Sequence, residues 1–125
     1  MTPNKIDENV LKHFTGSETL HRFNSLSPNT LLTDGALYVA QEGGAFWLMD
    51  VIASAQIKPL VKAEPFQVWK LSVLDDHTGY IEADDGNGLL IYKQTVDFTD
   101  FRPKFIELYA VADGTNLIIM LPSEY

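Results

Sequence analysis

The carboxylate best placed for chemistry in this sequence is Asp50, which interrupts an apolar stretch with helical spacing. A carboxylate in such a setting must face solvent, pair with a cation or have a raised pKa. If Asp50 lay in a pocket beside Trp47 or Trp69, an apolar wall could keep it protonated as a general acid. Trp47, Asp50 and Trp69 therefore form a candidate pocket, while partial exposure of Asp50 to solvent is the simpler interpretation. No residue is assigned a catalytic role.

A second chemical feature is the concentration of acidic residues between Asp75 and Asp100. Seven acids against one base, Lys93, give −6 out of a formal net charge of −8. Such a window usually forms a solvated hairpin end that aids solubility, but it also suits docking to a basic protein partner. A protein with this charge could further imitate a nucleic acid and occupy a DNA-binding protein. The residues expected on an acidic docking face are Asp75, Asp76, Glu82, Asp84 and Asp85.

Other familiar chemistries lack the residues that they need. Cysteine is absent, which excludes disulfides, thiolate nucleophiles and thiolate metal sites. The histidines, His13, His21 and His77, have neither of the short spacings that make a metal-binding face. The sequence contains no Gly-x-Ser-x-Gly elbow and no glycine-rich phosphate loop. We therefore predict no metal and no cofactor.

Composition and length indicate a soluble, cytoplasmic, single-domain protein. The 17 acids outnumber the nine Lys and Arg, which disfavours direct binding to nucleic acid. No run approaches the roughly 18 apolar residues that a membrane span requires, and the N-terminal residues lack the apolar stretch of a secretory signal. A chain of 125 residues, 46% of them apolar, suits one core. We predict one domain over residues 1–125, with residues 1–16 as a loosely attached helix.

The hydrophobic period changes from helical to strand-like near Glu64-Pro65. Before this point the spacing predicts helices over Ile6–Phe14, Ala36–Glu42 and Ala45–Gln56, the second capped by Thr33 or Asp34. The weak alternation over Thr19–Phe23 allows an edge strand or an extended link. After this point we predict strands over residues 67–73, 80–83, 89–96, 105–111 and 117–121.

Helices followed by strands predict an α+β fold, with N-terminal helices packed on a four- to five-stranded, mainly antiparallel C-terminal sheet. A meander is the economical strand order, although the long connection over residues 97–104 can break it. The open strand edges of such a sheet would also allow a homodimer.

Several segments together resemble a known family. They are Thr33-Asp34-Gly35, residues 45–54, residues 66–71, Asp85-Gly86-Asn87, Thr99-Asp100-Phe101 and the terminal Leu121-Pro122-Ser123-Glu124-Tyr125. The sequence is similar to a family of small bacterial proteins known only as a domain of unknown function, and the likeness covers most of the chain after Phe14. Its members occur in bacteria, including on mobile elements, and have no established activity, ligand or partner. The resemblance implies a stand-alone domain and assigns no functional residue.

Two classes of function follow from these observations. The first is a small, acidic, non-enzymatic accessory or protein-interaction domain, for which the resemblance implies a bacterial origin that includes mobile elements. It would show an exposed apolar or acidic patch and no convergent polar pocket. The alternative is a small hydrolase-like or ligand-binding enzyme that uses a buried carboxylate, which requires a concave site with several converging polar groups.

Overall fold

Strands make up most of the described chain. The computed structural model describes residue 11, residues 19–24 and residues 26–125. The strands are β1 (His21–Arg22), β2 (Thr30–Leu32), β3 (Phe66–Val73), β4 (Gly79–Asp84), β5 (Leu90–Val96), β6 (Phe105–Asp113) and β7 (Asn116–Met120). The helices are α2 (Asp34–Glu42), α3 (Phe46–Ala55), α4 (Pro59–Lys62) and the 3₁₀ turn η1 (Pro122–Glu124).

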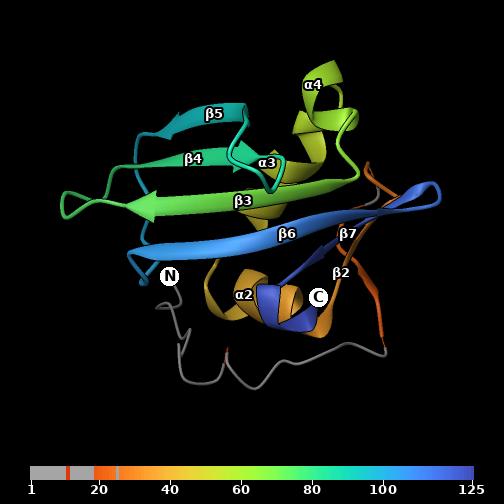
Figure 1. Ribbon diagram of the computed structural model, residues 1–125. Coiled ribbons are helices and arrows are strands. Elements are labelled where there is room, and N and C mark those ends of the chain that lie inside the picture. The colour runs from red at the N-terminus through yellow and green to blue at the C-terminus, as the bar shows by residue number, and fades with distance from the viewer. Residues whose placement is uncertain (1–10, 12–18, 25) are drawn as a thin grey trace.

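These strands form one mixed sheet in the order β1-β2-β7-β6-β3-β4-β5 (Figure 1). Most neighbours are antiparallel, but β2 runs parallel to β7, with Thr30 opposite Leu117 and Leu32 opposite Ile119. The seven-residue strand β5 forms one edge, and the two-residue strand β1 forms the other. Segments from both ends of the described chain therefore complete the same sheet.

The predicted fold class is wrong. We expected N-terminal helices on a four- to five-stranded, mainly antiparallel C-terminal sheet, whereas the described residues form a seven-stranded mixed sheet with three short helices. The additional strands, β1 and β2, come from the N-terminal part of the chain. Two or three residues are too few to show the alternation typical of a strand. In addition, β2 pairs with β7, which lies at the other end of the sequence, so no local signal indicates the pairing.

Most of the individual elements are confirmed. α2 and α3 occupy the segments predicted for them, and the Thr33 hydroxyl caps α2 by accepting a hydrogen bond from the Ala36 N–H at 3.2 Å. β3 to β7 correspond to the five predicted strands, and β1 is the edge strand allowed over Thr19–Phe23. The helix predicted over Ile6–Phe14 lies outside the described residues, apart from Leu11.

The long connection after β5 breaks the meander. β3, β4 and β5 follow one another, but β6 returns to pair with β3 on its other side. Phe101 is buried within this connection, and the Thr99 N–H donates to the His77 carbonyl at 2.8 Å. These contacts hold the crossing segment against the β3–β4 turn.

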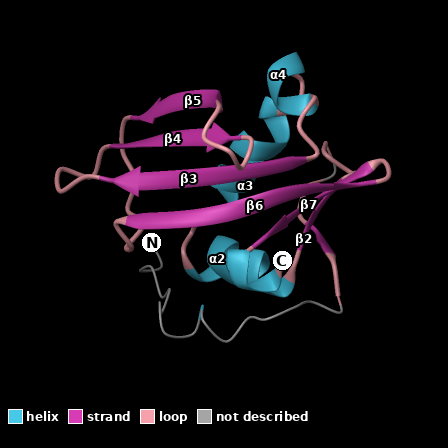
Figure 2. Cartoon of the chain, in the orientation of Figure 1, coloured by secondary structure: helices cyan, strands magenta, loops and turns pink. Residues whose placement is uncertain are grey.

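The core lies between the helices and one face of the sheet. Leu48, Met49 and Ile52 form a buried stripe on α3, as its helical spacing predicts. They belong to the same buried cluster as Trp69 and Leu108, which are opposite each other on β3 and β6. Figure 2 shows α3 crossing behind these central strands.

The C-terminal residues fasten α2 to the sheet. The Glu124 carboxylate accepts hydrogen bonds from the Gly35 N–H at 3.0 Å, the Thr33 hydroxyl at 2.6 Å and the Leu121 N–H at 3.0 Å. A negative charge at a helix N-terminus is favoured because unpaired N–H groups and the helix dipole meet it there. The η1 turn therefore supplies the second half of the α2 cap.

Candidate functional site

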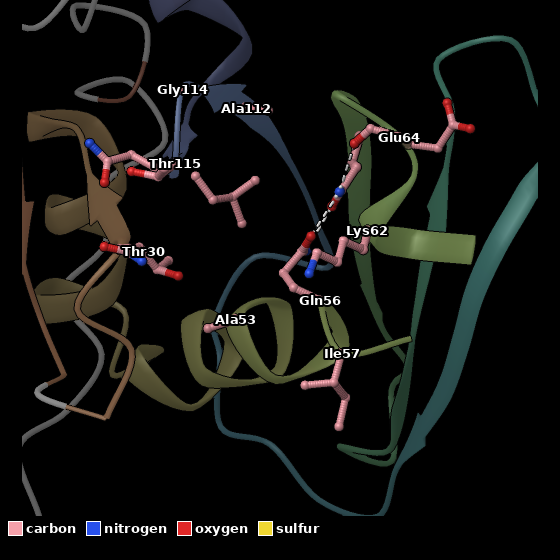
Figure 3. A pocket seen from close by; sticks show the side chains of 13 residues that line it. Thr30, Ala53, Gln56, Ile57, Lys62, Glu64, Ala112, Gly114 and Thr115 are labelled. Carbon is pink, nitrogen blue, oxygen red and sulfur yellow. Dashed lines mark hydrogen bonds between the residues drawn. The ribbon is translucent and has the colours of Figure 1, made fainter. Parts of the chain in front are cut away.

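A cavity of about 530 Å³ opens between the end of α3, α4 and the tip of the β6–β7 hairpin (Figure 3). Polar side chains from several elements line it, namely Asn29, Thr30, Gln56, Lys62, Glu64, Gln67, Thr115 and Asn116. The volume falls within the range of about 300–1,000 Å³ that is usual for small-molecule sites. This is the candidate functional site.

The inner wall of the cavity is held by Gln67, whose side chain is only 1% exposed. The two hydrogens of its amide nitrogen are shared among three acceptors, the Val61 carbonyl at 2.9 Å and, at 3.0 Å each, the Glu64 carbonyl and the Gln56 amide oxygen, which fixes the segment after α4. Its amide oxygen accepts from the Trp69 indole N–H at 2.9 Å. A buried amide must have such partners, so Gln67 ties β3 to the cavity wall.

Gln56 completes this network from the C-cap of α3. The two glutamine amides bond reciprocally, with N···O distances of 2.9 and 3.0 Å between Gln56 and Gln67. Gln56 also donates to the Ile52 carbonyl at 3.0 Å. Both hydrogens of its amide are therefore used within the protein, while its oxygen keeps one lone pair free for a further donor.

The opposite wall carries polar groups that are not engaged in this way. Thr30 is buried at 7% exposure, and Figure 3 shows its side chain turned toward the cavity. Within residues 19–24 and 26–125, neither Thr30 nor Thr115 has a side-chain hydrogen bond, and Lys62 has no ion pair. The cavity thus presents two hydroxyl groups and the solvent-exposed side chain of Lys62, to which the described residues supply no partner.

The structure does not bring Trp47, Asp50 and Trp69 together in this cavity, which none of them lines. Asp50 is exposed, and its carboxylate accepts a hydrogen bond from Asn24 at 2.9 Å. Trp69 is buried at 1% exposure beside Tyr92, and Trp47 is half-buried against the core. The simpler interpretation of Asp50, a solvent-facing carboxylate, matches its position.

The five acids of the expected docking face are distributed along the β4 strand. Asp75 and Asp76 lie in the turn before β4, Glu82 and Asp84 lie on one face of it, and Asp85 follows it. The two ends of β4 are about 17 Å apart at the rise of a strand. The acids therefore form a line along the edge hairpin and not a compact cluster.

Most of these acids also close turns. Asp84 and Asp85 accept hydrogen bonds from the N–H groups of Gly86 and Asn87 at 2.7 and 2.8 Å. Asp76 accepts from the Thr78 hydroxyl and N–H, and these bonds hold the pKa of Asp76 below its ordinary value of about 3.8. Asp84 and Asp75 also pair with Lys70 and Lys104, at 3.4 and 3.0 Å.

The sequence interpretation missed the residues of the cavity. Gln67 gave a usable signal, because it lies on the same side of the alternating strand as Trp69 and Leu71, where a polar residue must find buried partners. Thr30, Lys62 and Thr115 gave none, since they come from separate elements that only the tertiary fold unites.

The described chain contains no helix whose length and apolar character would let it cross a membrane.

Among proteins of curated function, none matches the sequence. One solved structure, the crystal structure of a protein of unknown function from Enterococcus faecalis, is similar in fold. It shares 18% sequence identity and a TM-score of 0.55, over 86% of this chain and 98% of that chain. Residues 5–125 match the family described as Family of unknown function (DUF6876). The resemblance seen in the sequence is confirmed, and the chain belongs to this family of unknown function.

Proposed function

We propose that this domain is a non-enzymatic protein-interaction module of the cytoplasm that binds an extended, basic segment of a partner protein along β5. The observation that supports the proposal is the position of the longer sheet edge inside the acid-rich window of the sequence. The lack of cysteine is in keeping with a reducing compartment.

The edge provides the main-chain contacts. In the described part of the chain β5 pairs with β4 alone, so no strand satisfies the backbone N–H and C=O groups on its outer side, although α4 lies close to β5. An extended peptide can satisfy these groups by adding a strand to the sheet. The opposite edge, β1, has two residues and is too short for this purpose.

The negative charge around the β5 edge favours a basic partner. Asp97 directly follows β5 and is exposed, and Glu82 on β4 stands opposite Lys93, the only base of the window. Lys93 is thus already faced by a carboxylate, and the surplus around the edge is negative. Charge complementarity of this kind raises the association rate and rejects acidic partners.

A second copy of the chain fits this edge less well. Pairing two copies would bring together two molecules with a net charge of −8 each, and like charges facing each other across strands are destabilising. The alternative class, a hydrolase-like or ligand-binding enzyme that uses a buried carboxylate, has a concave site in the cavity but no buried carboxylate among the described lining residues. Asp50 is exposed and lies outside the lining, and Glu64, which does line the cavity, is only half-buried.

The proposal is tested with a displayed library of random 12-residue peptides. We expect the domain to enrich peptides with net positive charge and alternating apolar residues. Binding by the double variant Glu82→Gln, Asp97→Asn should weaken about tenfold at low salt, because two edge charges are removed. The matched control Asp50→Asn, Asp113→Asn removes two charges elsewhere and should bind as the unmodified domain does.

Hydrogen exchange locates the binding site. A selected peptide should slow amide exchange in β5, since its strand would satisfy groups that solvent now reaches. Enrichment of neutral or acidic peptides, equal loss in both double variants, or protection confined to other elements would overturn the proposal. A concentration-dependent dimer in solution that protects β5 would show that a second copy occupies the edge instead.

A further inference from the structure

We infer that the cavity between α3, α4 and the β6–β7 hairpin binds a small organic ligand that carries one carboxylate together with hydroxyl or amide groups. This site lies apart from the β5 edge, and the inference is independent of the interaction proposed there.

The inner wall is organised before any ligand arrives. The Gln56 amide is held by Ile52 and by two bonds to Gln67, which is itself fixed by Val61 and Glu64. Little conformational freedom remains to be lost there when a ligand binds. The free lone pair of the Gln56 oxygen calls for a hydrogen-bond donor on the ligand, such as a hydroxyl or an amide N–H.

The outer wall offers groups that can donate as well as accept. The Thr30 and Thr115 hydroxyls line the cavity, and within the described ranges neither side chain has a hydrogen-bonding partner. The Asn116 amide lines the same side. A ligand rich in hydroxyl or amide groups can replace water at such groups with little loss of hydrogen bonding.

Lys62 sets the charge of the ligand. Figure 3 shows the Lys62 side chain extending toward Gln56, whereas the Glu64 carboxylate is turned away from it. No ion pair to Lys62 occurs among the residues described, so its ammonium group is available for a charge-assisted hydrogen bond. One cation in a protein of net charge −8 suits a single carboxylate better than a doubly charged phosphate, which proteins bind with several cations or backbone N–H groups.

The remaining lining fits a carbon skeleton. Ala53, Ile57, Ala112 and Leu117 contribute apolar surface between the two polar walls. A ligand site usually combines such a lining with a few polar groups that fix orientation. A small sugar acid or an acylated amino acid combines these properties, with a carboxylate at one end and hydrogen-bonding groups along a short skeleton.

The probes for this site are gluconate, quinate and N-acetylglutamine, each titrated to 10 mM while backbone and side-chain amide resonances are recorded. We expect at least one probe to shift the Gln56 side-chain amide and the backbone amides of Thr30 and Thr115, with a dissociation constant of about 1 mM or tighter. Sorbitol, which resembles gluconate without the carboxylate, should bind at least about tenfold more weakly.

Matched lysine variants separate the site from general charge effects. Lys62→Met keeps most of the side-chain stem and should weaken the binding of the carboxylate about tenfold. Lys58→Met, which removes an exposed cation that does not line the cavity, should leave it unchanged. Amide spectra that match the unmodified protein confirm that both variants are folded.

Three results would overturn the inference. No shift of the cavity resonances with any of the three carboxylates would show that the class of ligand is wrong. Equal binding of sorbitol and gluconate, or equal loss in both lysine variants, would remove the role of Lys62. Tighter binding of inorganic phosphate than of all three carboxylates, at the same resonances, would assign the cavity to a different anion.

Discussion

Gln67 is the residue on which the inner cavity wall depends, and we expect Gln67→Leu to lower the free energy of unfolding by about 2–4 kcal/mol. The leucine has a similar size but leaves the Trp69 indole N–H and the Val61 and Glu64 carbonyls without this partner. An unpaired buried polar group costs about 1–3 kcal/mol. Urea denaturation measures the change.

The matched control for this prediction is Gln41→Leu, since Gln41 is exposed on α2. Its unfolding free energy should change by less than about 0.5 kcal/mol. A similar small change in Gln67→Leu would mean that water reaches the indole and the carbonyls in its place.

The lowered pKa of Asp76 predicts that the stability of the β3–β4 turn depends on pH. Because hydrogen bonds from Thr78 lower the pKa of Asp76 in the folded state, its contribution to stability is present above its unfolded pKa of about 3.8. That contribution is lost as the pH falls through the lowered folded value. The chemical shift of the Thr78 amide should therefore titrate with a midpoint below 3.8, and Asp76→Asn should abolish this titration. A midpoint at or above 3.8 would contradict the assignment.

The α2 helix depends on a cap from a distant segment, and we expect Glu124→Gln to destabilise the protein by about 1–2 kcal/mol. The substitution removes the negative charge from the helix N-terminus and one of the oxygens that accept bonds from Gly35, Thr33 and Leu121. Thermal and urea unfolding measure the loss.

An acid at the other end of the same helix provides the control. Glu42 lies in the last turn of α2, where the helix dipole disfavours negative charge, so Glu42→Gln should leave stability unchanged or raise it by a few tenths of a kcal/mol. Equal losses in the two variants would argue for a general effect of charge rather than for a cap.

The elements differ in how far the sequence predicts them. α3 and β3 have clear periods because each is long enough to repeat its pattern and has one face buried. β2 has only three residues, too few to show a hydrophobic pattern. Its parallel pairing with β7 joins segments that are far apart in the sequence, so it depends on the tertiary fold. For that reason the segments were largely predictable and the sheet was not.

The cavity was less predictable than the sheet. Its walls combine Gln56 from the end of α3, Lys62 from α4, Thr30 from β2 and Thr115 from a hairpin turn. No short motif links such residues, so their convergence follows from the position of β7 beside β2 and from the return of β6 to β3. Asp50 and the acids between Asp75 and Asp100 were noticed in the sequence because of the residues next to them along the chain, and not because of any predicted tertiary contact.

At the scale of the whole molecule, the sheet joins early and late parts of the chain. β2 pairs with β7, and among the described strands β1 pairs with β2. The cavity is lined by residues from both of these distant segments, whereas the acidic edge belongs to the contiguous stretch from β3 to β5. Damage to the β2–β7 pairing should therefore affect the cavity before it affects the edge.

The pairing of β2 with β7 has a consequence for synthesis on the ribosome. Residues 30–32 leave the exit tunnel long before residues 117–119, and at about 5–20 residues per second the interval lasts several seconds. Throughout that time the nascent chain exposes the side chains that β7 will cover, and the N-terminus of α2 lacks the Glu124 carboxylate that caps it. The emergence of β7 and Glu124, and not that of any earlier helix or hairpin, is thus the event that completes the sheet and the α2 cap.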